Sequence, residues 1–133
     1  MTHEQRQMLI AAALDARQRA YAPYSRFQVG AALLSAKGAI IPGCNVENAS
    51  YGLTICAERV AMSAAISLGH RQFLALAVAA SGGPTPCGAC RQFLVEFAPQ
   101  LPVIIVDADA VDRTAEMRLD GLLPSAFHHT SHG

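Results

Sequence analysis

Two cysteine motifs constrain this chain more than any other feature. Cys56-Ala57-Glu58 lies upstream of Pro86-Cys87-Gly88-Ala89-Cys90, and together they supply three thiolates and one carboxylate. A structural zinc site closes its tetrahedron with four protein ligands, whereas a catalytic site leaves one position open for water. Three cysteines with a glutamate two residues after the first therefore predict an open zinc site that is suited to hydrolysis.

Both motifs fall where helices are predicted to begin. A helix is expected over 56–68, which is rich in alanine and ends at Gly69, and another from Pro86 to about residue 97. Unpaired amides and the helix dipole favour negative charge at a helix start, so thiolates form more easily there. Cys87 and Cys90, three residues apart, share one helix face. The fold must therefore bring two helix starts together at one metal ion.

The rest of the chain alternates between helical and extended patterns. Apolar residues at helical spacing predict a helix over 4–20, and short apolar runs predict strands over 27–35, 39–44, 73–80 and 101–106. After residue 106 come a short charged segment, then residues 119–123, and then a polar tail. Strands that alternate with helices in the second half imply right-handed crossovers and parallel neighbours. We expect one α/β domain, residues 1–133, with a mixed sheet between helices in three layers.

Charge and hydropathy limit the possible partners. Ten basic and ten acidic residues cancel, and the basic ones are scattered singly, so the basic stripe of a nucleic-acid binder is missing. No apolar run approaches the roughly 20 residues that span a bilayer, and the first residues lack the layout of a signal peptide. We expect a cytoplasmic protein with a small polar substrate, no nucleic acid and no membrane. The remaining cysteine, Cys44, is interpreted as a small buried apolar residue.

Glu58 and Arg59 complete the predicted metal site. A carboxylate beside the metal can take a proton from water and pass it to a substrate. Alone, Glu58 would be an ordinary first-turn glutamate, but its place two residues after Cys56 favours the catalytic role. Three thiolates leave excess negative charge on a dication, and hydrogen bonds to sulfur from Arg59 or Arg91 could offset it. Of the two arginines, Arg59 is preferred.

Beyond these motifs, the chain resembles the short cytidine deaminases. The Cys-Ala-Glu and Pro-Cys-x-x-Cys pair matches the signature of zinc-dependent nucleobase deaminases in its three-cysteine form. The resemblance runs from about Tyr21 to Phe127 and is carried by residues 24–33, 43–54, 56–59, 86–92 and 122–127. It implies a three-layer α/β/α fold with a five-stranded mixed sheet.

The resemblance also implies a reaction. Cytidine and 2′-deoxycytidine would be hydrolysed to uridine and 2′-deoxyuridine with release of ammonia, a reaction of pyrimidine salvage. One zinc ion per chain would activate the water that attacks C4, and Glu58 would carry protons to N3 and to the departing amine. The implied zinc ligands are Cys56, Cys87 and Cys90.

Substrate contacts are implied in the same way. Phe27 would stack on the base, Asn45 and Glu47 would hold the ribose 3′-hydroxyl, and the backbone of Ala57 would lie near the pyrimidine. A homotetramer with composite active sites is implied as well. In it, Tyr51 and Phe127 would reach toward the site of a neighbouring subunit.

Other interpretations account for part of the motifs. A redox dithiol at Cys87 and Cys90 leaves Cys56-Ala57-Glu58 unexplained, and a non-catalytic zinc module lacks a fourth ligand, since Cys44 lies outside both helix starts. A deaminase of a blasticidin-type antibiotic would not be expected to keep the segment 45–51. Deaminases of nucleotides or polynucleotides usually have histidine as the first ligand. For the tail with His128, His129 and His132, weak metal binding is the alternative to a frayed polar end.

Overall fold

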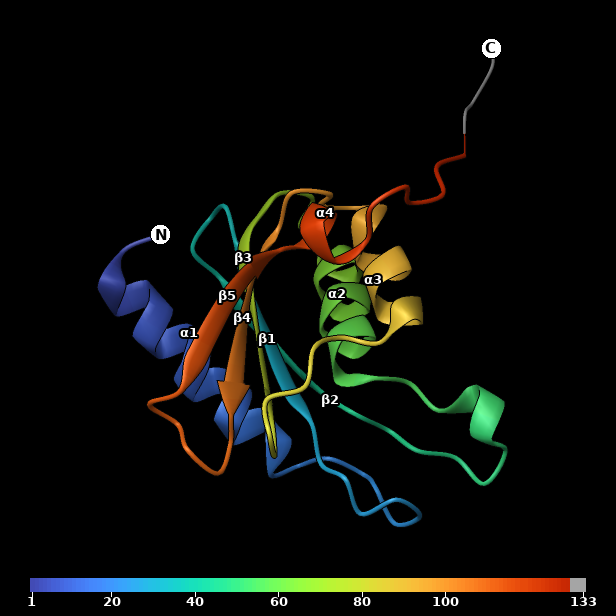
Figure 1. Cartoon of the computed structure of the whole chain (residues 1–133). Helices are drawn as coiled ribbons and strands as arrows, with labels where there is room; N and C mark the ends of the chain where they lie inside the picture. Colours follow the sequence, from blue (N-terminus) through green and yellow to red (C-terminus); the bar gives the residue numbers. More distant parts are fainter. Residues whose placement is uncertain (130–133) are drawn as a thin grey trace.

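The computed structural model describes residues 1–129 and has one mixed sheet between helices (Figure 1). The strand order is β2-β1-β3-β4-β5. In chain order the elements are α1 (His3–Arg17), β1 (Gly30–Ser35), β2 (Ile40–Cys44), the 3₁₀ helix η1 (Tyr51–Leu53), α2 (Ala57–Ser67), β3 (Phe73–Ala80), α3 (Gly88–Val95), β4 (Pro102–Asp107), β5 (Thr114–Arg118) and α4 (Leu119–Leu122). The predicted three-layer fold with a five-stranded mixed sheet is confirmed.

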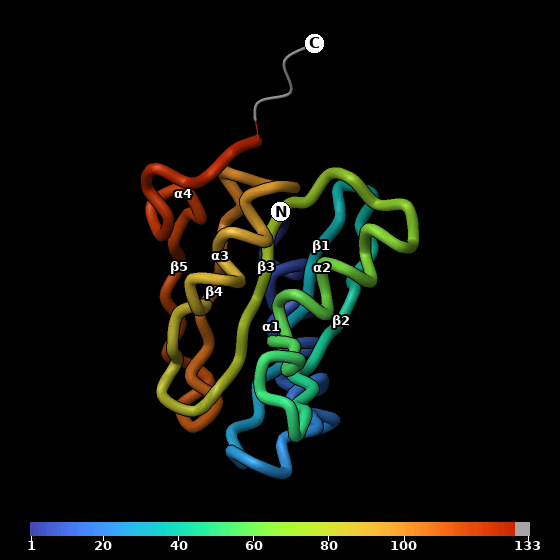
Figure 2. The backbone as a smooth tube through the Cα atoms, turned by 90° about the vertical axis from the view of Figure 1, so that its right-hand side faces the viewer, coloured from blue at the N-terminus to red at the C-terminus, as the bar shows by residue number. Residues whose placement is uncertain are grey.

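The strand directions place the starts of α2 and α3 at the same edge of the sheet. β1 is antiparallel to both β2 and β3, so β2 and β3 run in the same direction, and β3 is parallel to β4. α2 connects β2 to β3, and α3 connects β3 to β4. Crossovers between strands of the same direction pack their helices back onto the sheet. The two helices lie side by side on one face, as Figures 1 and 2 show.

The sheet separates two layers of hydrophobic core. Successive residues of a strand point to opposite faces, and in β3 the alanines at 75, 77 and 79 face α1, whereas Leu76 and Val78 face α2 and α3. β1 is buried along its whole length. α1 therefore covers one face alone, and the other face carries the helices on which the cysteine motifs lie.

Two glycines allow helix backbone to touch strand backbone. A Cβ atom at Gly30 would lie 2.0 Å from the carbonyl oxygen of Ala13 in α1, and one at Gly43 would lie 2.5 Å from the backbone nitrogen of Ala61 in α2. Gly30 pairs with Cys44, the residue after Gly43, so the two contacts lie next to each other on opposite faces of the sheet. The contact at Gly43 fixes how far α2 stands from the sheet.

Several predicted boundaries are wrong in detail. α1 ends at Arg17, β1 begins at Gly30 instead of residue 27, and α3 begins at Gly88 with Cys87 as its N-cap, so Pro86 lies before the helix. The predicted charged segment before residue 119 contains β5, whose residues are all exposed. Cys44 is only half-buried. His128 and His129 are exposed, and His132 lies outside the described residues.

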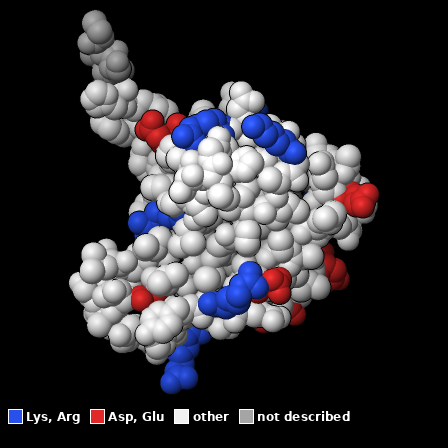
Figure 3. Space-filling model, turned by 180° about the vertical axis from the view of Figure 1, so that it is seen from behind, with Lys and Arg blue, Asp and Glu red and all other residues white. Residues whose placement is uncertain are grey.

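Over residues 1–129, the helices are all too short or too polar to cross a membrane. On the face that Figure 3 shows, Lys and Arg side chains are dispersed and lie among acidic ones.

Candidate active site

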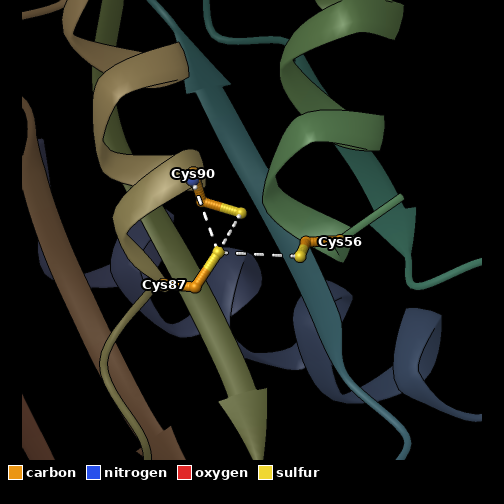
Figure 4. Close-up of side chains that lie close together, drawn as sticks. All are labelled: Cys56, Cys87 and Cys90. Atoms are coloured by element: carbon orange, nitrogen blue, oxygen red, sulfur yellow. Dashed lines mark hydrogen bonds between the residues drawn. The ribbon is translucent and has the colours of Figure 1, made fainter. Parts of the chain in front are cut away.

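Three cysteines converge where α2 and α3 begin (Figure 4). Cys56 is the N-cap of α2, Cys87 is the N-cap of α3, and Cys90 lies in the first turn of α3. The Sγ of Cys87 lies 3.8 Å from that of Cys56 and 3.3 Å from that of Cys90, and all three lie within 4.8 Å of one another. Sulfur atoms around a tetrahedral zinc ion are about 3.8 Å apart, given Zn–S bonds of about 2.3 Å. The trio therefore fits a zinc ion, and within residues 1–129 no fourth histidine, cysteine or carboxylate joins the group.

The charge state of the cysteines also fits a metal. The pKa of Cys56 is lowered to about 5, chiefly by a hydrogen bond with the thiol of Cys90 and further by Arg59. The pKa of Cys90 is raised, first by the same hydrogen bond with Cys56 and then by burial. Without a cation, Cys56 and Cys90 therefore favour a state in which Cys56 is the thiolate and Cys90 the thiol. A soft dication that binds thiolates, such as zinc, allows all three to be deprotonated.

Arg59 is the arginine that contacts a ligand sulfur. Its Nη2 donates to the Sγ of Cys56 at 3.7 Å and to the carbonyl oxygen of Thr54 at 3.2 Å. Its Nε is buried and finds no hydrogen-bond partner within residues 1–129. A cation hydrogen-bonded to a thiolate ligand withdraws charge from the metal site. This is the role that the sequence assigns to Arg59.

Arg91 and Gln92 of α3 hydrogen-bond to neighbouring chain segments, whereas Arg59 contacts a cysteine sulfur. Arg91 donates to oxygens of Pro86 at 2.7 Å, Leu122 at 2.8 Å and Thr85 at 2.8 Å. The Gln92 side chain bonds both the carbonyl oxygen of Phe127, at 2.8 Å, and its backbone N–H, at 3.2 Å. These two side chains join the loop before α3 to the segment after α4.

Glu58 lies in the first turn of α2 and is 4% exposed. Burial raises its pKa to about 7, and the negative charge of Cys56 adds to the rise, while a backbone hydrogen bond opposes it. A carboxyl group with a pKa near neutrality can both accept and donate a proton at physiological pH. Its position beside the cysteines therefore suits acid–base chemistry on a ligand of the metal.

A cavity of about 320 Å³ opens beside the cysteines. Its volume is at the lower end of the range for small-molecule sites. Among residues 1–129, those that line the cavity include neither lysine nor arginine. The predicted site residues that line it are Phe27, Asn45, Glu47, Cys56, Ala57, Glu58 and Cys87.

Asn45 and Glu47 hold the segment that carries Phe27. The Oδ1 of Asn45 accepts from the N–H of Val29 at 2.9 Å, and its Nδ2 donates to the carbonyl oxygen of Phe27 at 2.8 Å. The Oε1 of Glu47 accepts from the N–H groups of residues 24 and 25, at 3.0 and 3.1 Å, and its Oε2 accepts from the Ser25 hydroxyl. Sequence reasoning missed Ser25, because no local pattern signals its contact with a residue 22 positions away.

Tyr51 and Phe127 lie apart from Glu58. Their side chains are 76% and 72% exposed, and neither lines the cavity beside the cysteines. Tyr51 packs edge-to-face on Tyr24, with ring centroids 6.2 Å apart, and lines a neighbouring hollow with Glu47. In a single chain, both aromatic rings are therefore accessible to another protein molecule.

Comparisons with known proteins agree with this geometry. Residues 3–106 match the family model of the cytidine and deoxycytidylate deaminase zinc-binding region. A cytidine deaminase of Halalkalibacterium halodurans is 52% identical over 124 residues, which are 92% of this chain and 93% of the relative. One from Mycobacterium tuberculosis is 46% identical over 122 residues, 90% of this chain and 87% of that protein. The crystal structure of cytidine deaminase from Burkholderia pseudomallei has a TM-score of 0.88 and 47% identity, covering 96% of this chain and 100% of that one. The chain belongs to the cytidine deaminase family.

Proposed function

We propose that the chain catalyses the zinc-dependent hydrolysis of cytidine to uridine and ammonia, with 2′-deoxycytidine as a second substrate. One observation carries the proposal: the cysteine cluster and the buried Glu58 adjoin a single cavity of ligand size in a member of the cytidine deaminase family. The reaction adds one water at C4 of the pyrimidine and releases the 4-amino group as ammonia, so no further reactant is needed.

The site residues have two roles: the cysteines would hold a zinc ion that activates water, and Glu58 transfers protons. A zinc ion held by Cys56, Cys87 and Cys90 would lower the pKa of a water molecule and so supply a nucleophile at neutral pH. The Glu58 carboxylate accepts the proton that this water loses. The resulting carboxylic acid donates this proton to N3 of the pyrimidine. In a later step Glu58 accepts the proton of the new hydroxyl at C4 and passes it to the 4-amino group, which leaves as ammonia while the C4 carbonyl forms. In the metal-free protein, burial raises the pKa of Glu58 toward neutrality, the direction that suits a group that both accepts and donates a proton.

Asn45 and Glu47 have hydrogen-bonding capacity left for a sugar hydroxyl. The Asn45 amide uses one of its two N–H groups on Phe27, which leaves one donor. The Glu47 carboxylate accepts three hydrogen bonds from residues 24 and 25, which leaves about one of its four acceptor positions. A hydroxyl needs one partner of each kind. We therefore assign the ribose 3′-hydroxyl to this pair and the base to the ring of Phe27.

Free nucleosides fit the cavity better than nucleotides. In the described part of the chain, its lining offers the carboxylates of Glu47 and Glu58 and no lysine or arginine. A phosphate group would meet negative charge without a compensating partner, which disfavours its binding. The base, in contrast, finds an apolar wall that includes Phe27 and Val78.

Quaternary structure and location stay predictions. A homotetramer would cover the exposed rings of Tyr51 and Phe127 and would bring them to a neighbouring subunit's site. Exposed aromatic side chains of this size are typical of contact surfaces. Sedimentation of a fully active monomer at micromolar concentration would contradict the composite site. A cytoplasmic location is likewise expected from the sequence.

The activity is tested by the ultraviolet change from cytidine to uridine, with and without a zinc chelator. Cytidine, 2′-deoxycytidine, cytidine monophosphate and adenosine are assayed in parallel. We expect turnover of the first two and loss of turnover with the chelator. The Glu58→Gln protein should fold and bind zinc but release no ammonia. A wild-type protein that holds one zinc ion per chain and deaminates neither nucleoside would refute the proposal.

A further inference from the structure

We propose that Ser25 is a positioning residue for substrate binding: its hydroxyl connects the Glu47 carboxylate to the backbone of Phe27 and so holds the Phe27 ring in the cavity wall. The inference rests on the proposed function, because it concerns how the base is bound. It adds to the site a residue that lines the cavity and whose hydroxyl bonds to Glu47 and Phe27.

The segment that carries Phe27 depends on side chains for its shape. Residues 26–29 form neither helix nor strand. Arg26, directly before Phe27, has a φ of 59°, in the left-handed region that residues with a Cβ rarely adopt. Such a conformation persists only where the surroundings enforce it. A backbone hydrogen bond from the Arg26 N–H to the carbonyl oxygen of Ala22, at 2.9 Å, holds this residue on one side, and the contacts of Phe27 hold the chain that follows.

Both peptide groups of Phe27 are bound by side chains. Its N–H donates to the Oγ of Ser25 at 3.0 Å, and its carbonyl oxygen accepts from Nδ2 of Asn45 at 2.8 Å. Asn45 is 7% exposed, and its own backbone N–H donates to Val29 at 3.2 Å, so this side of the segment is firmly anchored. Ser25 is itself exposed and needs a second anchor to hold the other side.

Glu47 provides the second anchor. Its backbone N–H donates to the carbonyl oxygen of Tyr21 at 2.8 Å, and its carboxylate accepts from the hydroxyl of Ser25. The Ser25 hydroxyl thus donates to one partner and accepts from the other. Donation to a carboxylate polarises the hydroxyl oxygen and strengthens its bond to the Phe27 N–H. The sugar-binding carboxylate and the base-stacking ring are in this way parts of one hydrogen-bonded unit.

The ionisation of Glu47 is consistent with this contact. The pKa of Glu47 is lowered, and the hydrogen bond from the Ser25 hydroxyl is the largest cause. Glu47 is therefore ionised near neutral pH, the state in which its carboxylate accepts the Ser25 hydroxyl. It also provides a readout that does not depend on catalysis.

The first experiment compares Ser25→Ala with Ser25→Thr in the zinc-loaded protein. Loss of the hydroxyl frees one side of the Phe27 backbone, so we expect KM for cytidine to rise about 5- to 10-fold, the worth of roughly one hydrogen bond, with kcat within about twofold. Ser25→Thr, which keeps the hydroxyl, should stay within about twofold of wild type. Ser67→Ala, at the exposed last residue of α2, is the matched control. Equal losses in the Ala and Thr variants, or a fall in kcat alone, would overturn the proposal.

The second experiment asks whether Ser25 acts through Phe27. In a Phe27→Ala background, Ser25→Ala should cause less than about a twofold further change in kcat/KM, because the ring that Ser25 positions is absent. A repeated 5- to 10-fold loss would mean that Ser25 contacts the substrate itself and would rule out the positioning role.

A third readout separates this inference from the proposed function. Carbon-13 NMR titration of the Glu47 carboxyl, assigned with Glu47→Gln, should give a higher pKa in Ser25→Ala than in wild type. An unchanged pKa would show that the contact is absent in solution, whatever the activity. Failure of the wild-type protein to deaminate cytidine would refute the proposed function instead, and the titration would still decide whether Ser25 holds Glu47.

Discussion

Gly43→Ala tests whether the contact of α2 with the sheet determines the geometry of the metal site. An added Cβ would lie 2.5 Å from the nitrogen of Ala61, 2.7 Å from the carbonyl oxygen of Ala57 and 2.9 Å from the Cα of Ala61. All three atoms are helix backbone, which cannot swing aside as a side chain can. Carbon needs about 3.5 Å from such atoms, so α2 must move outward by roughly half to one ångström.

The expected effects are large enough to measure. Overpacking of this kind costs about 1–3 kcal/mol, which for a chain of this size lowers the melting temperature by roughly 5–15 °C. Cys56 begins α2, whereas Cys87 and Cys90 belong to α3. Zinc–ligand distances tolerate only about 0.2 Å, so a shift of Cys56 alone should weaken zinc binding about 10- to 100-fold.

Thermal unfolding of the zinc-loaded protein and competition with a chromophoric chelator measure the two effects. Gly121→Ala is the matched control, because a Cβ there would meet nothing within 4 Å. We expect this control to change the melting temperature by less than about 2 °C, since helical alanine is favoured over glycine. The reasoning fails if Gly43→Ala matches the control in both melting temperature and zinc affinity.

Three other perturbations test separate parts of the site. Arg59→Ala should lower turnover while zinc content, measured by plasma mass spectrometry, is nearly kept; unchanged turnover over the whole pH range would exclude a role for its contact with Cys56. In zinc-free protein, the raised pKa of Glu58 favours the folded state below pH 4.5, and this contribution is lost as pH rises through about 7. In urea denaturation, the free energy of unfolding of Glu58→Gln relative to that of wild type should therefore increase by about 3 kcal/mol between pH 5 and 9. A difference between the two proteins that does not vary with pH would contradict the burial argument. Gln92→Ala removes both hydrogen bonds to Phe127 and should speed hydrogen exchange of the Phe127 amide, and equal exchange rates would show that other contacts hold this segment.

The metal ligands could be predicted because their signals are local. Cys56 and Cys87 each cap a helix, and a helix start is recognisable within a few residues of sequence. β3 was predicted at its observed bounds, since residues 75–80 are all buried and form a continuous apolar run. The prediction missed β5, because this edge strand is exposed at every position and its short alternation, with only Ala115 and Met117 apolar, lies within a charged segment. Only its pairing with β4, a tertiary contact, makes it a strand.

The surroundings of Phe27 show the other limit of sequence reasoning. The apolar pattern extended β1 back to residue 27, but residues 27–29 are bound mainly by the side chains of Ser25, Asn45 and Arg17. A single backbone bond, from the N–H of Asn45 to the carbonyl oxygen of Val29, joins them to the end of β2. These bonds join segments that are distant in the chain. No period or spacing within either segment encodes them, so the role of Ser25 emerged only from the folded structure.

The paired contacts at Gly30 and Gly43 have a consequence for protein engineering. A layer of side chains between helix and sheet can absorb a substitution by changing rotamers, but here backbone meets backbone on both faces of the sheet. We therefore expect a displacement of α1 at Ala13 to move the hairpin of β1 and β2 and, through Gly43, the first turns of α2. A mutant library restricted to the residues of the cavity wall would omit substitutions that act on α2 through α1 and the hairpin. Ala13, on the far side of the sheet from the cysteines, belongs among the positions through which selection can alter the active site.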